Sequence, residues 1–181
     1  MKSETNSKIP RGIRNNNPLN IRVGNKWQGE VDVKTDKDFE QFIDVKYGIR
    51  AAILILYRYV FKSGLHTIRD ILRRWAPPVE NNTKAYEQSV RYFIGKLMEP
   101  NKDIPYYGDI EWRRSDIFYL LYGMCKVESN YTLKWDTFKE AWELAEKTNP
   151  KIYEHLPQSE QDWLKRERKK SCFPYCVDLK R

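Results

Sequence analysis

The chain has 181 residues, of which 40% are hydrophobic and 14% aromatic, and it carries a formal net charge of +8. This length and composition predict one folded domain of ordinary size with tails, and they exclude a wholly disordered chain. The excess positive charge favours an anionic partner, which nucleic acid, an anionic membrane or a bacterial wall with acidic polymers would each supply.

Residues 1–10 are polar, lack the apolar core of a signal peptide, and are expected to form a flexible tail. The longest apolar run, residues 51–57, is far too short to span a bilayer. We therefore expect a chain without a membrane span that is made in the cytoplasm without a signal peptide. Any role at the cell wall would then need a delivery device.

After an Asn-rich stretch at residues 11–17, two β-compatible runs follow at 19–23 and 27–33, joined through Gly24. This pattern predicts a small antiparallel β-hairpin near the N-terminus. The rest of the chain shows apolar residues at helical spacing. Helices are expected at about residues 47–62, 67–75, 83–98, 116–127, 135–147 and 158–170.

The predicted fold class is therefore mainly α (α+β), with one small β element. The main domain is expected to cover residues 11–148. A basic extension, residues 149–181, is expected to follow it.

The end of the 116–127 helix carries the candidate acid, Glu128. It lies four residues after Met124, so it continues the apolar stripe of this helix instead of pointing to solvent. An apolar surrounding disfavours the charged carboxylate, which is the condition that a general acid needs near neutral pH. The alternative is an ordinary glutamate of the last helical turn that bonds the backbone or Lys126.

A longer part of the chain resembles phage virion lysozyme-like proteins, which are often structural proteins with wall-degrading domains. The resemblance covers most of residues 11–90. The matching strings are RGIRNNNPLNIR at 11–22, WQG at 27–29, FEQF at 39–42, YGIRA at 47–51 and RWAPPVENNTKAY at 74–86.

A more distant resemblance is to bacterial glucosaminidases and lytic transglycosylases of the lysozyme-like superfamily. In these enzymes a helix that ends in Glu-Ser-x-aromatic comes first, a hairpin with Trp-x-Gly follows in the glucosaminidases, and a tyrosine-containing turn comes later. Here the second and third parts resemble residues 17–29 and 78–86, whereas the first resembles residues 128–131, far downstream. The resemblance therefore implies a circularly permuted lysozyme-like domain.

The same resemblance implies cleavage of the β-1,4 bond between amino sugars of peptidoglycan glycan strands, with Glu128 as proton donor. Ser129 would hydrogen-bond the acid or the sugar, and Tyr131 would stack on a sugar ring or hold its loop. Tyr86 would line the cleft. The remaining residues that it suggests for substrate binding are Trp27 and Asn20. Arg14, Arg22 and Arg50 could contact the lactyl or peptide carboxylates of the glycan, and the alternative for each is surface solubility.

Three alternatives stay open for the acidic residues. Glu80 competes for the role of the acid because it lies in the clearest matching string, although it also suits the start of a helix. Glu30 could activate a water molecule as a second carboxylate, and Asp32 and Asp36 compete with it. Without such a partner, the 6-hydroxyl or the acetamido group of the substrate would serve as nucleophile.

The sequence predicts no cofactor and no metal site, because it has neither a Gly-rich phosphate loop nor a cluster of metal ligands. Cys172 and Cys176 are expected to be tail thiols without a catalytic role. The charge pattern argues against nucleic acid as the partner, because acidic residues are interspersed among the basic ones. The competing function is a non-catalytic module of a virion or another wall-crossing apparatus that binds the wall.

Overall fold

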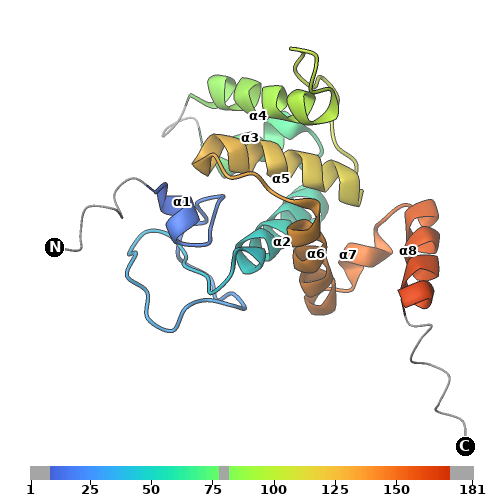
Figure 1. The fold of residues 1–181 in the computed structure, drawn as a ribbon, viewed down its shortest axis with the longest axis horizontal. Helices are drawn as coiled ribbons and strands as arrows, with labels where there is room; N and C mark the ends of the chain where they lie inside the picture. The colour runs from blue at the N-terminus through green and yellow to red at the C-terminus, as the bar shows by residue number, and fades with distance from the viewer. Residues whose placement is uncertain (1–8, 78–81, 172–181) are drawn as a thin grey trace, which may run out of the picture.

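The computed structural model describes residues 9–77 and 82–171, and its regular structure is helical (Figure 1). This confirms the mainly α prediction. The helices are α1 (Arg11–Arg14), α2 (Val45–Ser63), α3 (Ile68–Trp75), α4 (Thr83–Met98), α5 (Arg114–Ser129), α6 (Trp135–Thr148), α7 (Lys151–Glu154) and α8 (Gln158–Ser171).

Local sequence signals explain where these helices begin and end. The side chain of Asp44 accepts a hydrogen bond from the backbone N–H of Lys46 at the start of α2, and Gly64 ends this helix with φ +66°. Thr67 caps α3 and Asn82 caps α4 in the same way as Asp44. Helix α5 begins at Arg114, two residues before the predicted start, and its N-cap position is occupied by Arg113.

The hydrophobic core lies between α2, α5 and the helices that pack on them. Helix α4 packs along α5, and α6 packs along α2. The largest fully buried side chains include Trp142, Phe138, Ile53, Leu56 and Ile117. At its C-terminal end, α5 lies beside α1, so residues far apart in the sequence meet there (Figure 1).

The predicted hairpin between residues 19–23 and 27–33 is not formed. Each of these segments instead makes one isolated antiparallel bridge to a third segment, Arg22 with Phe39 and Glu30 with Phe42. The physical reason is local: the Glu30 carboxylate accepts a hydrogen bond from the backbone N–H of Trp27, and Gly29 adopts φ +81°. Both features close a turn where the second strand was expected.

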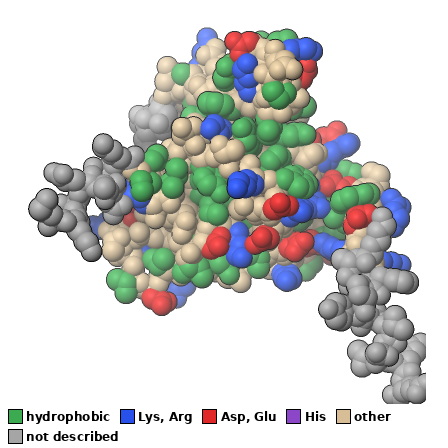
Figure 2. All heavy atoms as spheres, viewed as in Figure 1, with side chains coloured by type: hydrophobic (Ala, Val, Ile, Leu, Met, Phe, Trp, Pro, Cys, Tyr) green, Lys and Arg blue, Asp and Glu red, His purple; other side chains and the backbone are tan. Residues whose placement is uncertain are grey.

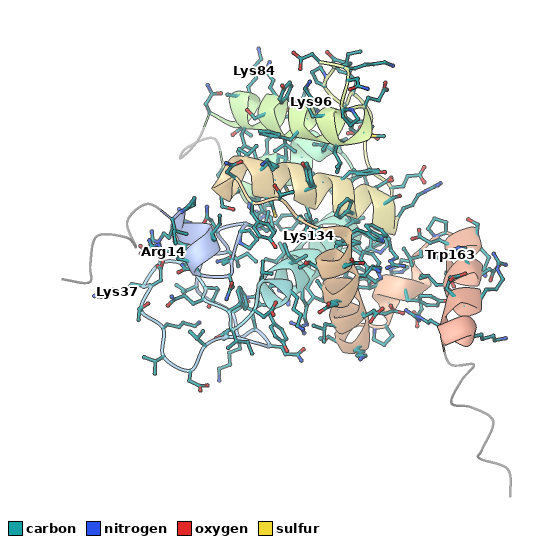
Figure 3. The ribbon with its side chains drawn as sticks, viewed as in Figure 1. Arg14, Lys37, Lys84, Lys96, Lys134 and Trp163 are labelled. Carbon is teal, nitrogen blue, oxygen red and sulfur yellow. The ribbon has the colours of Figure 1, made fainter. Side chains whose placement is uncertain are left out.

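The first part of the predicted C-terminal extension packs on the same core. The hydrophobic cluster includes Ile152 of α7, Leu156 of the segment between the two helices, and Leu164 of α8. Trp112 Nε1 donates to the carbonyl oxygen of Ile152 at 3.0 Å. Helix α8 lies at one edge of the molecule, where Trp163 is 48% exposed (Figure 3). Cys172 and Cys176 lie outside the described residues.

On the face drawn in Figure 2, acidic and basic side chains lie next to one another. The structure contains ion pairs on its surface, for example Lys46 with Glu140 at 3.1 Å and Arg168 with Glu146 at 2.7 Å. No helix among residues 9–77 and 82–171 is both long enough and apolar enough to cross a membrane.

Candidate active site

Glu128 lies in the last turn of α5 and is half-buried. The helix ends there because Asn130 adopts a left-handed conformation with φ +53°, and the Tyr131 N–H then closes the turn on the carbonyl oxygen of Cys125. Both oxygens of the Glu128 carboxylate accept a hydrogen bond. Asn20 Nδ2 donates to Oε2 at 2.9 Å, and the Tyr86 hydroxyl donates to Oε1 at 2.8 Å.

These three residues come from three separate segments of the chain. Asn20 belongs to the N-terminal loop, Tyr86 to α4 and Glu128 to α5, and the contact between Asn20 and Glu128 spans 108 positions. The carboxylate is therefore fixed from two sides. Such a constraint holds one oxygen in a defined direction, as proton transfer to a bound ligand requires.

Asn20 is positioned by the Asn-rich segment before it. Its backbone N–H donates to the carbonyl oxygen of Asn17, and it adopts the left-handed region with φ +49°, which asparagine tolerates better than most residues. The Asn17 side chain is buried and donates to the carbonyl oxygens of Ile21 and Glu40, both at 2.9 Å. The Asn-rich string thus folds into a support for the side chain that holds Glu128.

Ser129 and Gly12 join this support to α5. Ser129 is only 4% exposed, and its hydroxyl donates to the carbonyl oxygen of Pro18 at 2.8 Å. A Cβ atom on Gly12 would lie 3.0 Å from the Ser129 Cβ and 2.9 Å from the Asn17 carbonyl oxygen. The close approach of α1 to α5 therefore needs glycine at position 12.

Tyr86 is held where its hydroxyl has little access to water. Burial raises the pKa of Tyr86 well above its ordinary value, and the neighbouring Glu128 carboxylate raises it further. Tyr86 therefore stays a neutral hydrogen-bond donor to the carboxylate over the whole physiological range.

A groove of about 590 Å³ opens beside Glu128. It runs between the N-terminal loop and the region where α2 and α3 meet. Its lining residues are Leu19, Asn20, Ile21, Arg22, Asn25, Phe39, Ile55, Tyr59, Arg74, Trp75, Ala76, Pro77 and Glu128. Among the described residues that line it, Glu128 is the one acidic side chain. The volume of the groove lies in the range of typical ligand sites.

The candidates for a second carboxylate, Glu30, Asp32 and Asp36, do not line this groove with Glu128. Glu30 forms an ion pair with Lys34 at 2.9 Å, and Lys34 also bonds the fully buried Glu40. Asp36 lines a different depression, where Arg11 donates two hydrogen bonds of 2.6 Å to its carboxylate. Asp32 is exposed and does not line the groove either. Glu80 lies outside the described residues.

Other residues named from the sequence also lie away from the groove. The Trp27 side chain is 8% exposed and belongs to the hydrophobic core. Tyr131 is half-buried against the core, and burial raises its pKa. Arg50 is 4% exposed and donates to Thr148 Oγ1 at 2.7 Å, so it is not available to a ligand. Arg14 lines the depression that holds Asp36.

The structure adds groove residues for which no role was predicted, among them Arg74, Trp75 and Tyr59. Arg74 and Trp75 begin the matching string at residues 74–86, so the resemblance contained a signal for them. Tyr59 carried none, because its helical spacing fits an ordinary core stripe. In the described part of the chain, no cluster of three or more His, Cys, Asp or Glu side chains is arranged to hold a metal ion.

Comparison with protein families found no family model that matches the chain. The chain is similar to Protein P5 of Pseudoalteromonas phage PM2, with 48% identity over 80 residues. The match covers 42% of this chain and 50% of the phage protein, so the chain matches about half the length of this relative. Over the matched residues, the chain is thus related to a phage protein.

Proposed function

We propose that the chain cleaves the β-1,4 bond between amino sugars of peptidoglycan, with Glu128 as the general acid. The observation that carries the proposal is the geometry of Glu128. It is a half-buried carboxylate at the edge of a groove, and hydrogen bonds from Asn20 and Tyr86 hold both of its oxygens. A positioned acid beside a ligand-sized groove is what protonation of a glycosidic oxygen requires.

The reaction that fits a single acid begins with proton transfer from Glu128 to the glycosidic oxygen. The bond between this oxygen and the anomeric carbon then breaks, and positive charge develops on that carbon. The described residues that line the groove offer no second carboxylate. We therefore assign the nucleophile to the substrate: its 6-hydroxyl attacks the anomeric carbon and returns a proton to Glu128, which leaves a 1,6-anhydro sugar.

Asn20 and Tyr86 are positioning residues in this proposal, because they touch the acid and orient it. Ser129 acts one step further away, since its hydroxyl ties α5 to the loop that carries Asn20. Glu30 is not needed as a base and keeps a structural role in its ion pair with Lys34.

The setting that we propose is a virion or another apparatus that crosses the bacterial wall. The similarity to a phage protein supports a phage origin. The net charge of +8 suits a wall that contains acidic polymers. We further propose a permuted lysozyme-like domain, because the segments that resemble the three parts of the superfamily pattern meet at one carboxylate.

The test is Glu128→Gln, with purified sacculi as substrate and mass spectrometry of the soluble products as readout. We expect the wild-type chain to release anhydro-muropeptides and Glu128→Gln to release none. Circular dichroism should show that both chains are folded. Glu143→Gln is the matched control, because Glu143 is exposed on α6 outside the groove. Glu30→Gln and Glu80→Gln test the competing acids and are expected to keep activity per folded molecule.

Equal product release by Glu128→Gln and the wild-type chain would reject Glu128 as the acid. A wild-type chain that sediments with sacculi but releases no muropeptides would instead favour the non-catalytic wall-binding module. Products with ordinary reducing ends would reject attack by the 6-hydroxyl and return the choice to the acetamido group or to water.

A further inference from the structure

Two arginine side chains, Arg22 from the N-terminal loop and Arg74 from the end of α3, line the groove beside Glu128. A guanidinium group presents a planar set of donors that fits the two oxygens of a carboxylate. A guanidinium group at this groove therefore suits a ligand with a carboxylate.

Arg74 is the better placed of the two for recognition. It is exposed in the last turn of α3, next to Trp75 and Pro77, which also line the groove. It lies close enough to the Tyr59 hydroxyl to oppose the rise in the pKa of Tyr59 that burial causes. Arg74 and Tyr59 thus lie together in the groove wall.

An aromatic surface adjoins this guanidinium. Tyr59 and Trp75 meet edge to face, with ring centroids 6.4 Å apart and an interplanar angle of 77°. Both are half-buried and line the groove. Aromatic faces suit the apolar side of a sugar ring, while the guanidinium suits an acidic substituent of the same sugar.

We propose that Arg74 is a specificity-determining residue that pairs with a free carboxylate on the glycan strand. The groove then prefers anionic strands to neutral amino-sugar polymers. The inference rests on the proposed function for the identity of the polymer, although binding tests it without any cleavage. Two sources on the strand share this chemistry: the carboxylates of its peptides, and the lactyl carboxylate of a sugar whose peptide has been removed.

The experiment measures binding of soluble glycan fragments to the Glu128→Gln chain by calorimetry, so that the ligand is not consumed. Three probes are compared: native fragments, the same fragments with every carboxylate converted to a neutral methylamide, and fragments stripped of peptide by an amidase. We expect native fragments to bind about fivefold more tightly than amidated ones, the upper size of an exposed ion pair.

A second substitution, Arg74→Gln, is then added, and we expect both fragments to bind alike. Arg73→Gln is the matched control, because Arg73 is the exposed neighbour on α3 that does not line the groove. It should keep the fivefold preference. Arg74→Lys should keep part of it, since lysine retains the charge without the planar donors. Preference for stripped over amidated fragments assigns the lactyl group, and its absence assigns the peptide.

The inference is overturned if Arg74→Gln keeps the preference, or if the parent chain binds neither native nor stripped fragments more tightly than amidated ones. Cleavage by the wild-type chain is followed separately on sacculi. A chain that prefers native fragments but never cleaves them refutes the proposed function and leaves the role of Arg74 standing. A chain that cleaves sacculi without this preference refutes the role of Arg74 and leaves the proposed function standing.

Discussion

Tyr86→Phe is the most selective test of how the acid is held. The substitution removes one hydroxyl, which donates to Glu128 Oε1 at 2.8 Å, and it keeps the aromatic ring that packs against the core. The bond from Asn20 to the other oxygen remains. Any change therefore reports the loss of a single hydrogen bond to the carboxylate.

The expected size follows from the charge and burial of the pair. Glu128 becomes a charged carboxylate as it gives up its proton, and a hydrogen bond to a charged group contributes about 1.5–3 kcal/mol net. Because Glu128 is only half-buried, a water molecule can partly replace the hydroxyl, and the lower end of this range applies. A loss of about 1.4 kcal/mol corresponds to roughly a tenfold fall in kcat/KM, with about 1 kcal/mol lost from the free energy of unfolding.

Release of soluble muropeptides from sacculi measures the first quantity, and urea unfolding measures the second. Tyr107→Phe is the matched control, because the Tyr107 side chain is 79% exposed and lies outside the groove. If Tyr86→Phe cleaves at the wild-type rate and unfolds at the same urea concentration, the hydroxyl does not hold the acid and our reasoning fails.

Three further predictions concern stability and the support of the site. Hydrogen bonds from Arg11 hold the pKa of Asp36 well below its ordinary value, so the stability that they contribute is present at neutral pH and lost in acid. Asp36→Asn should therefore lower the free energy of unfolding by about 1 kcal/mol at pH 7 and by less near pH 3, measured by urea unfolding; equal losses would contradict this. Burial raises the pKa of Tyr86, so its contribution is complete below about pH 10 and lost as the pH rises further. Tyr86→Phe should flatten the alkaline loss of stability above about pH 10, and an unchanged slope there would refute it. Gly12→Ala should cost about 1–3 kcal/mol and reduce muropeptide release, because its Cβ would approach the Ser129 Cβ to 3.0 Å; a thermal midpoint and a rate like those of the wild-type chain would disprove it.

The longer helices could be predicted from the sequence because their signals are local. The apolar spacing predicted a helix at 47–62, and α2 spans Val45–Ser63. Thr67 and Gly64 mark the start of one helix and the end of another, as their side chains and backbone preferences dictate. Such signals depend on neighbours within a few positions, so they do not require the tertiary fold.

The N-terminal region could not be predicted in the same way. Its two extended runs suit a hairpin, yet each makes a single bridge to residues 39–42. The choice depends on the turn that Glu30 closes on the backbone of Trp27, and on the burial of Trp27 in the core. The turn bond joins a side chain to the backbone and the burial involves other segments, so the alternation of residue types within one strand contains neither.

The candidate site shows the same division. Helical spacing predicted that Glu128 continues the apolar stripe of α5, and the structure places its side chain half-buried. The spacing gave no information on which residues contact the acid, because Asn20 is 108 positions away. The resemblance supplied Asn20 and Tyr86 as separate candidates, and Arg74 was part of a matching string without a role.

The order of segments along the chain does not decide whether such a site can form. A hydrogen bond from Asn20 to Glu128 depends on where the two side chains lie in space. The contact of α1 with α5 brings these segments together, whether the helix that carries the acid comes before or after the N-terminal loop in the sequence. The Ser129 hydroxyl bonds the Pro18 carbonyl oxygen at the same junction. Since Tyr86 reaches the same carboxylate from α4, side chains from three separate segments meet at one acid. We proposed a rearranged domain because these are the three segments in which the sequence resembles the superfamily pattern, and coincidental resemblances have no reason to converge on one carboxylate.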